Sequence, residues 1–358
     1  MKLVAAVKLL PTRAQATCLK ATLARCNEAC SWLAAFGFER QTLRQYDLHK
    51  LAYGELRDRF GLTAQAAVRS IAKVADAFKV NRKAAPIFRQ FAAQPYDDRI
   101  IRFVQDGAAV SLWTIEGRMT VPVVMGEHQR RLMAYRKGEI DLCFVRGKWM
   151  LAATCDIPET EEFKAADWLG VDLGIVNLAV DSDGTVHAGT DVERVRQRLA
   201  RRRAGLQRRG TKAAKRCLRK LAGKEARFRK HTNHRLSKAI VQTAERTARG
   251  IALEDLTHIR KRVTARRSRR SRLHSWSFGQ LRAFVAYKAK RRGVPVAAVS
   301  PKYTSQACSC CGCIDKRNRP DQATFSCIFC FHTEAADLNA ARNIRATAAV
   351  TPPVVLAA

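Results

Sequence analysis

The first half of the chain changes its hydrophobic pattern twice. Residues 2–9 alternate apolar and polar side chains, which predicts a strand with one buried face. From residue 12 to about 90, apolar residues recur at helical spacing, and this spacing predicts several helices. Residues 98–158 consist of short alternating runs with turn signals such as Asp106-Gly107. We therefore expect a small antiparallel barrel or sheet, which strand 2–9 joins, with the helices as an insertion.

The second half predicts a mixed α/β domain. The run WLGVDLGIVNLAV, a turn at Asp183-Gly184 and the segment TVHAG are typical of a hairpin. Residues 191–249 have the spacing of long, very basic helices, and the apolar runs IALEDL and VPVAAVS beyond them predict strands on either side of another helix. An alanine-rich run near the end predicts a last helix, and the tail after it is expected to be loose.

Length and charge narrow the class of protein. At 358 residues the chain can hold two or three domains, and its 66 basic and 31 acidic residues give a net charge of +35. Such a chain repels itself unless a polyanion neutralises it, so we expect nucleic acid as the partner. A membrane surface is the competing anion, but no stretch reaches the roughly 20 apolar residues of a spanning helix. Lys2, Lys8 and Pro11 interrupt the N-terminus too often for a signal peptide, so we expect a cytoplasmic protein.

Three acidic residues stand in settings that suggest a shared site. Asp172 lies within an apolar run, Glu254 ends another, and Asp337 begins the alanine-rich run. Taken singly, each has an ordinary explanation, such as a turn residue for Asp172 or a helix cap for Asp337. Glu254 is followed directly by Asp255, and the sequence leaves open which of the two belongs to the site. Taken together, such carboxylates could hold two divalent ions about 3.5–4 Å apart for phosphodiester cleavage. Magnesium, which prefers oxygen ligands, is the expected metal.

Six of the twelve cysteines crowd between residues 308 and 330. Cys308-x-x-Cys311 and Cys327-x-x-Cys330, separated by fifteen residues, form a four-thiolate zinc signature. The site is expected to be structural, because four thiolates leave no open position on the metal. The alternatives are free thiols or a metal-free loop, and either of the other two cysteines in the cluster, Cys310 and Cys313, could exchange into the site. The remaining six are expected to be buried or incidental thiols: Cys18, Cys26, Cys30, Cys143, Cys155 and Cys217.

Two arginine-rich runs, 193–235 and 259–272, contain very few acidic residues. A solvated helix face would mix both signs of charge, so we favour contact with nucleic-acid phosphates, for which arginine is well suited. The second run follows Glu254 closely, and we hypothesise that it is a lid that orders on substrate. The candidate phosphate-binding residues are Arg201, Arg202, Arg203, Arg208, Arg209, Arg266, Arg267, Arg269 and Arg270.

Longer motifs carry a family resemblance. Residues 168–346 resemble the RuvC-type, RNase H-like nuclease core of TnpB proteins, which are encoded by insertion-sequence transposons and related to type V CRISPR effectors. The matching segments are GVDLGIVNLAV at 170–180, IALEDL at 251–256, LHSWSFGQLRAFVAYKAKRRGVPVAAVSPKYTSQACSCCG at 273–312 and ADLNAARNI at 336–344. The first half is similar in layout and in the short stretches KLLPT and CNEA. One departure is Phe331, which stands where the family usually has Gly after the last cysteine, so metal affinity is expected to be reduced.

The resemblance implies a function and its components. Asp172, Glu254 and Asp337 would be the catalytic acids, with two Mg²⁺ ions, in a metal-dependent endodeoxyribonuclease guided by RNA. The guide RNA would derive from the transposon end, and the target would be double-stranded DNA beside a short motif. We expect one protein per RNA, no membrane partner, and a place near the nucleoid of a prokaryote. The alternatives are a nuclease-inactive RNA-guided repressor and a transposition accessory protein; the complete set of acids favours the nuclease.

The resemblance also implies a domain layout. We expect an α/β nuclease domain of RNase H-like (RuvC) fold with an inserted zinc finger, preceded by a β-barrel wedge domain that carries a helical recognition insertion. The expected boundaries are 1–10 and 96–165 for the wedge, 11–95 for the recognition domain, 166–302 and 332–348 for the nuclease domain, 303–331 for the zinc finger, and 349–358 for a flexible tail.

Overall fold

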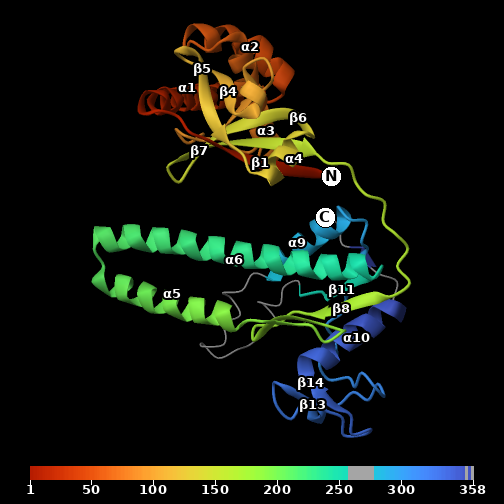
Figure 1. The fold of residues 1–358 in the computed structure, drawn as a ribbon. Helices are drawn as coiled ribbons and strands as arrows, with labels where there is room; N and C mark the ends of the chain where they lie inside the picture. The colour runs from red at the N-terminus through yellow and green to blue at the C-terminus, as the bar shows by residue number, and fades with distance from the viewer. Residues whose placement is uncertain (257–277, 351–353, 356–358) are drawn as a thin grey trace. The chain divides into compact units, whose positions relative to one another are not determined.

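The computed structural model of the chain describes residues 1–256, 278–350 and 354–355 (Figure 1). The chain forms two compact units, Met1–Pro158 and Glu159–Ala358. Each unit has its own hydrophobic core, and the two are described separately below.

The first unit is built on a seven-stranded antiparallel sheet in the order β2-β6-β7-β1-β5-β4-β3. Its edge strands β2 and β3 are consecutive in the chain and are joined by only residues 97–100, so the sheet has to curl into a nearly closed barrel. The strand expected at 2–9 is confirmed and lies inside this sheet. The bounds are β1 Lys2–Leu9, β2 Gln94–Tyr96, β3 Ile101–Val104, β4 Ala109–Thr114, β5 Gly117–Val124, β6 Arg136–Val145 and β7 Lys148–Asp156.

Three helices stand between β1 and β2, as the hydrophobic spacing predicted. They are α1 (Arg13–Glu39), α2 (Gln45–Asp58) and α3 (Ala64–Val80), and the short helices η1 (Gln105–Gly107) and α4 (Glu127–Met133) follow later in the unit. The Thr12 side chain and Gln15 cap each other's backbone N–H groups at the start of α1. The helices and the barrel share one core, in which four of the scattered cysteines are buried: Cys18, Cys26, Cys30 and Cys155.

The second unit contains a six-stranded sheet in the order β10-β9-β8-β11-β12-β15. Strands β8, β9 and β10 are antiparallel neighbours, whereas β11 runs parallel to both β8 and β12. The run WLGVDLGIVNLAV forms two strands, β8 and β9, with a tight turn between them, and TVHAG contains the third, β10. The segment predicted to be a hairpin therefore contains three strands. The tail, expected to be loose, adds β15 antiparallel to β12. The bounds are β8 Trp168–Asp172, β9 Asn177–Asp181, β10 Val186–Ala188, β11 Gly250–Glu254, β12 Val296–Val299 and β15 Val354–Val355.

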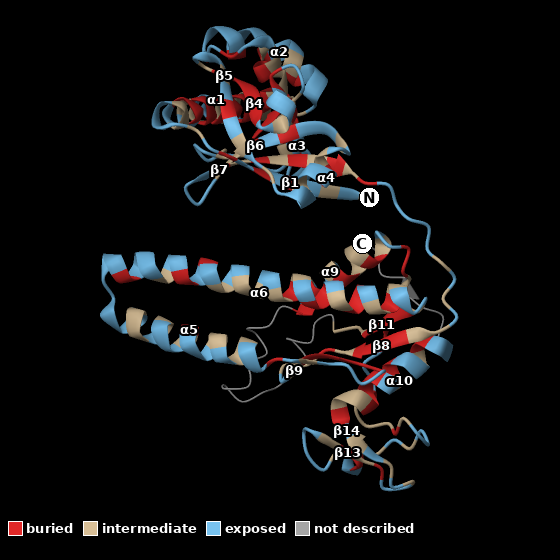
Figure 2. Cartoon of the chain, in the orientation of Figure 1, coloured by how far each residue is buried: buried red, intermediate tan, exposed pale blue. Residues whose placement is uncertain are grey.

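Helices cover both faces of this sheet. Alternation along β8 and β11 turns Leu169, Val171, Ile251 and Leu253 toward the core that α6 (Lys212–Arg246) and α9 (Phe278–Lys290) complete. The opposite face, with Ala252, packs against α10 (Ala336–Val350). Figure 2 shows buried residues concentrated where these helices meet the sheet. The helix α5 (Thr190–Arg209) precedes α6, and the two form an antiparallel hairpin joined at Gly210, whose φ of 64° suits glycine (Figure 1).

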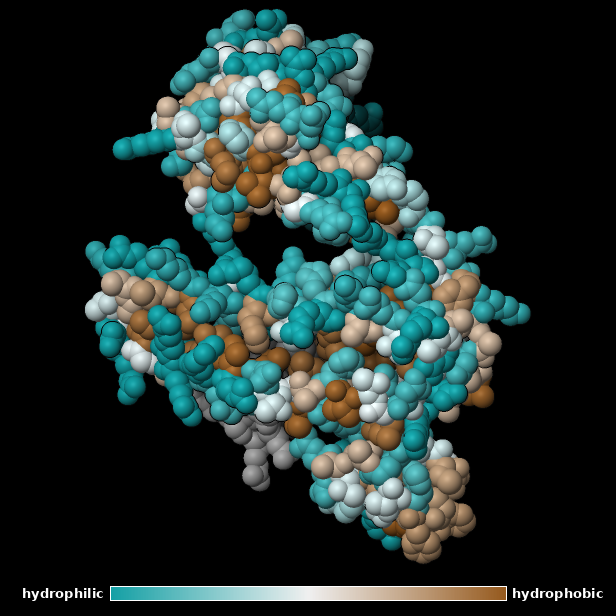
Figure 3. All heavy atoms as spheres, viewed as in Figure 1, coloured by the Kyte–Doolittle hydropathy of each residue, from teal (hydrophilic) through white to brown (hydrophobic). Residues whose placement is uncertain are grey.

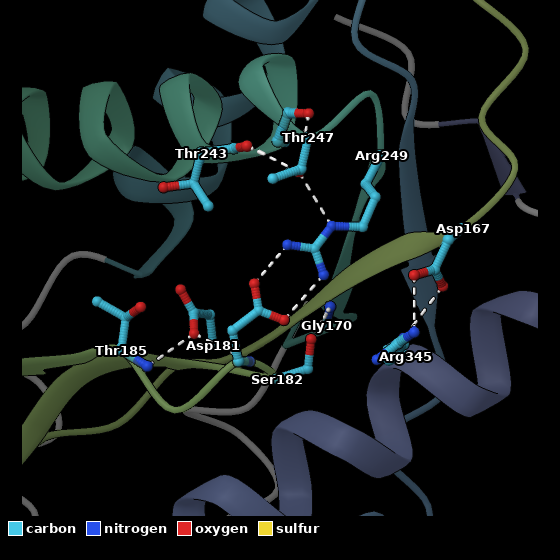
Figure 4. A network of polar contacts seen from close by, with 11 residues as sticks. Asp167, Gly170, Asp181, Ser182, Thr185, Thr243, Thr247, Arg249 and Arg345 are labelled. Atoms are coloured by element: carbon cyan, nitrogen blue, oxygen red, sulfur yellow. Dashed lines mark hydrogen bonds and ion pairs between the residues drawn. The ribbon is translucent and has the colours of Figure 1, made fainter.

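Two ion pairs hold the sheet to its flanking elements (Figure 4). Arg249, just before β11, pairs bidentately with Asp183 in the turn between β9 and β10. Arg345 of α10 donates to Asp167, just before β8, at 3.0 and 2.7 Å. The bidentate geometry fixes orientation as well as contact. Both pairs lie at the ends of β8 and β11 that are opposite to Asp172 and Glu254.

A small module lies between β12 and α10 in the chain. It contains η2 (Lys316–Asn318) and a two-stranded sheet of β13 (Thr324–Ser326) and β14 (Thr333–Ala335), and it includes the cysteine cluster. Across the described parts of the chain, no helix is both long enough and apolar enough to cross a membrane.

Gly170 permits the close packing of α10 on β8. A Cβ at this position would lie 2.1 Å from the Ala341 carbonyl oxygen and 2.6 Å from the Arg345 nitrogen, both of them backbone atoms that cannot rotate away. We predict that Gly170→Ala lowers the free energy of unfolding by about 3 kcal/mol or more, measured by chemical denaturation. Gly205→Ala in α5 is the matched control, because nothing lies within 4 Å of its added Cβ; it should be neutral or stabilising by up to about 1 kcal/mol. Equal effects of the two substitutions would contradict this packing.

Candidate active site and metal-binding module

The sheet register brings two of the three predicted acids together. Val171 of β8 pairs with Leu253 of β11 in parallel register, so Asp172 and Glu254 occupy the next positions at the carboxyl ends of adjacent strands. Side chains alternate between the faces of a strand, so Asp172 lies on the same face as Gly170, which is the face that α10 covers.

Asp337, the third acid, is the second residue of α10. Its Oδ2 accepts a hydrogen bond of 2.8 Å from Nδ2 of Asn177, which is the first residue of β9 and hence next to β8 in the sheet. The acids of three distant segments therefore gather at one end of the sheet, with Asp172 near both of the others.

Burial and like charge act on these carboxyl groups. The pKa of Asp172 is raised to about 7, first by burial and then by the charges of Glu254 and Asp337, while the guanidinium of Arg319 acts in the opposite direction. Burial also raises the pKa of Glu254, and a hydrogen bond from the Thr304 hydroxyl opposes that rise. A half-buried group of like charges with one cation near it is electrostatically unfavourable, and a bound metal cation would relieve the repulsion.

The structure separates the adjacent pair that the sequence left open. Glu254 ends β11 beside Asp172 and accepts from Thr304, whereas Asp255 forms an ion pair with Arg282 of α9. Glu254 is therefore the member of the pair that joins the acidic group. Asp255 is instead held by its contact with Arg282 inside the second unit.

Sequence reasoning missed three side chains that contact or influence the acids. Asn177 and Thr304 belong to quoted motifs, GIVN and YTSQ, but nothing in their spacing indicated which carboxylate each would contact. Arg319 lies in the polar loop between the two cysteine pairs, more than 140 residues from Asp172, and no local signal connects them.

The four predicted cysteines come together. The sulfur atoms of Cys308, Cys311, Cys327 and Cys330 all lie within 4.8 Å of one another, and among the residues that the structure describes this is the only group of metal-ligand type so tightly set. Cys310 and Cys313 are outside the group, so neither replaces a member of it. His332 is also outside the group, and its Nε2 lies 3.1 Å from a carboxylate oxygen of Glu334.

The two cysteine pairs have the same backbone geometry. The N–H groups of Gly312 and Phe331 donate to the carbonyls of Cys308 and Cys327, at 2.9 and 3.1 Å. Both residues are in the left-handed region, with φ of 75° for Gly312 and 58° for Phe331. Glycine adopts this conformation freely, whereas phenylalanine is strained in it. Phe331 is 81% exposed. Figure 3 shows apolar residues on the surface of this module.

Two side-chain amides, of which Asn339 is fully buried, connect the cysteine module to the helix that carries Asp337. Asn339 of α10 accepts from Ser309 N–H at 2.9 Å and donates to the Ala307 carbonyl at 2.8 Å. Asn343, one turn later, donates to the carbonyls of Thr304 and Ala307. The position of Asp337 is therefore linked to the folding of the cysteine segment.

The predicted basic run 193–235 forms most of the α5–α6 hairpin. Residues 190–246 contain 20 Lys and Arg against four Asp and Glu. Arg203 is half-buried and forms an ion pair with Glu225 of α6, so it stabilises the hairpin. The other four predicted contact residues in α5 are exposed: Arg201, Arg202, Arg208 and Arg209. The four in the second run, Arg266, Arg267, Arg269 and Arg270, lie outside the described residues, as does the lid hypothesis.

Comparison with known proteins confirms the resemblance. Residues 153–260 match the family described as "Probable transposase", and residues 278–344 match the family "Cas12f1-like, TNB domain". The CRISPR-associated endodeoxyribonuclease Cas12f1 of Sulfoacidibacillus thermotolerans is 36% identical over 217 residues, covering 56% of this chain and 50% of that protein. The TnpB-like protein MJ0751 of Methanocaldococcus jannaschii is 32% identical over 142 residues, covering 37% of this chain and 51% of that protein.

The likeness extends to a solved structure. The Cas12f1-sgRNA-target DNA complex matches with a TM-score of 0.62 at 15% identity, over 91% of this chain and 82% of that one. At this identity the match supports the fold alone. The chain spans about half the length of the curated relatives it matches.

The raised pKa of Asp172 predicts that the free energy of unfolding of the metal-free protein depends on pH. In the folded state the Asp172 carboxyl group keeps its proton up to about pH 7, whereas in the unfolded state it loses the proton near pH 3.8. The free energy of unfolding is therefore highest below pH 3.8 and falls as the pH rises to about 7. Asp172→Asn mimics the protonated form. We predict that its stability relative to wild type rises by about 2–3 kcal/mol between pH 5 and 8 in magnesium-free buffer, as measured by urea denaturation. A pH-independent difference would contradict this.

Proposed function

We propose, from the similarity to TnpB-like and Cas12f1-type proteins, that the chain is an RNA-guided DNA endonuclease with a RuvC-type active site. The observation that carries the proposal is the meeting of Asp172, Glu254 and Asp337 at one end of a sheet whose first three strands are antiparallel and whose next two are parallel. This strand arrangement is the one that an RNase H-like fold requires.

The donor set at the acids suits magnesium. All three candidate ligands are hard oxygen donors, and their mutual repulsion would be relieved by divalent cations. Carboxylates that converge from three separate segments can bridge and cap a pair of such ions. Bound there, two Mg²⁺ ions would activate a water molecule and stabilise the leaving oxygen of a phosphodiester.

The neighbouring side chains orient the carboxylates. Asn177 directs one oxygen of Asp337, and the Thr304 hydroxyl fixes one oxygen of Glu254, which leaves the other oxygen of each group for a ligand. Arg319, from the cysteine module, supplies positive charge near Asp172 and would attract a phosphate group of the substrate.

The cysteine module fits a structural zinc ion. Its four sulfur atoms suit tetrahedral coordination and leave no position open for a substrate. The backbone N–H groups of Phe329 and Cys330 point at Cys327 Sγ, at 3.4 and 3.5 Å, and such donors stabilise a thiolate.

Guide RNA and target DNA are the proposed partners of the whole chain. The charge of +35 and the exposed arginines of α5 provide phosphate contacts on the scale that an RNA and an opened duplex need. We retain the proposal that the RNA comes from the transposon end, with one protein per RNA in a prokaryotic cytoplasm. The barrel would be the wedge domain and α1–α3 the recognition domain, with the boundaries expected from the sequence.

The acid assignment is tested by Glu254→Gln and its neighbour Asp255→Asn. The protein purified with its co-expressed RNA should cut a plasmid that carries the matched target and a randomised flanking motif, in the presence of magnesium. Removing one ligand charge should slow cutting about 100-fold or more, since metal-held charge contributes several kcal/mol. Asp255→Asn, which loses only the contact to Arg282, should retain cutting within a few-fold. Asp172→Ala should abolish cutting and preserve guided binding.

These variants also discriminate between functions. Guided binding without cutting by the wild-type protein would support the repressor instead. Equal loss of cutting in Glu254→Gln and Asp255→Asn would contradict the assignment of Glu254.

The strain at Phe331 predicts a gain in zinc affinity on mutation. Phe331→Gly removes the left-handed strain without losing packing, and we expect about fivefold tighter zinc binding, corresponding to about 1 kcal/mol. Gly312→Ala is the matched opposite, because its φ is also positive and nothing lies within 4 Å of the added Cβ; it should weaken binding by a similar factor. Competition with a chromophoric chelator measures both. A shift of the same sign in the two variants would rule out strain as the cause.

A further inference from the structure

A cavity of about 380 Å³ opens between the β8–β9 turn and the start of α5. Ile175 and Val176 line it from the turn. Thr190, Arg194 and Gln197, which are exposed, and Glu193, which is half-buried, line it from the first two turns of the helix. None of these residues has a part in the acidic group or in the cysteine module, and neither the sequence motifs nor the comparisons assign them a role.

The cavity adjoins the acids through the chain itself. Ile175 is three residues from Asp172, a distance of at most about 11 Å between their Cα atoms. Val176 directly precedes Asn177, whose amide contacts Asp337. One wall of the cavity is therefore continuous with the segment that carries one acid and orients another.

The cavity walls are fixed to each other. The Gly189 N–H, at the start of α5, donates to the Val176 carbonyl at 2.8 Å, and a Cβ on Gly189 would lie 2.5 Å from that same oxygen. On the helix side, the Glu193 carboxylate accepts from Gln197 at 2.9 Å and from Arg196 at 2.7 Å. Only glycine allows the turn and the helix to approach this closely, and the space between them is therefore preformed.

The chemistry of the two walls is unequal. The turn offers aliphatic surface, with Val176 53% exposed, while the helix offers a hydroxyl, a carboxylate, a guanidinium and an amide. An unpaired nucleobase has the same division, with apolar faces and a polar edge, and extruded bases are held by apolar packing and edge hydrogen bonds. The volume is within the usual range for small-ligand sites, about 300–1,000 Å³.

We propose that this cavity receives an unpaired base of the DNA strand being cut. The base would lie within about three nucleotides of the scissile phosphate, given about 3.4 Å of rise per nucleotide and the span to Asp172. This inference rests on the proposed function, because opening of the duplex by a guide RNA is what leaves a strand unpaired near the acids. Holding one base would position the backbone for cleavage and make the choice of cleavage position depend on the base.

The test uses two valine substitutions and abasic DNA. Val176→Trp fills the cavity, and Val186→Trp in β10 is the matched control, since Val186 is exposed to a similar extent, 54%, and does not line the cavity. The substrate is a matched linear duplex in which single abasic nucleotides replace each position across the cut region in turn. The protein carries its co-expressed RNA, and guided binding is measured alongside cleavage.

For the wild-type protein and Val186→Trp, one abasic position close to the cut should slow cleavage about tenfold, the effect of losing one base contact. Val176→Trp should cut intact DNA about tenfold more slowly, bind it equally, and show no further loss at that position. Uniform tolerance of abasic sites by the wild type, or equal behaviour of the two tryptophan variants, would overturn the cavity assignment and leave the nuclease intact. Absence of magnesium-dependent cutting by the wild type would overturn the proposed function itself.

Discussion

The parallel pairing of β8, β11 and β12 is the constraint on which the rest of the second unit depends. Parallel neighbours cannot be joined by tight turns, so the chain must leave the sheet and return between them. The first excursion contains β9, β10 and the α5–α6 hairpin, and the second includes α9. The same pairing sets the register that places Asp172 beside Glu254, and a slip of one residue by either strand would turn its acid to the other face of the sheet.

Charge is segregated within this unit. The hairpin concentrates basic residues almost without acids, while the acids at the sheet end are half-buried and repel one another. A polyanion is attracted to the first surface and repelled by the second unless cations occupy it. Under the function proposed above, this arrangement would couple the capture of nucleic acid to the presence of metal, because the phosphate backbone could approach the carboxylates only when ions neutralise them.

The sequence indicated elements whose signal is local. The strand at 2–9, the helices after Thr12 and the spacing of the four cysteines each follow from periodicity or from fixed intervals. The three strands within WLGVDLGIVNLAV and TVHAG were harder to separate, because an apolar turn at Leu173–Val176 interrupts no hydrophobic pattern. Partners such as Asn177, Thr304 and Arg319 could not be assigned to the acids, since each depends on segments brought together only by the fold. The pairing of Arg203 with Glu225 likewise depends on how α5 lies along α6.

The linkage of the cysteine module to α10 through Asn339 and Asn343 has a consequence for the environments in which the protein can work. Hydrolysis involves no electron transfer, yet the helix bearing Asp337 is held by backbone groups of Thr304, Ala307 and Ser309, close to thiols that an oxidant would convert to disulfides or sulfenic acids. Damage to those sulfur atoms would loosen the segment that presents a carboxylate some distance away. Under the function proposed above, peroxide stress would therefore silence a hydrolytic centre whose own carboxylates peroxide does not oxidise.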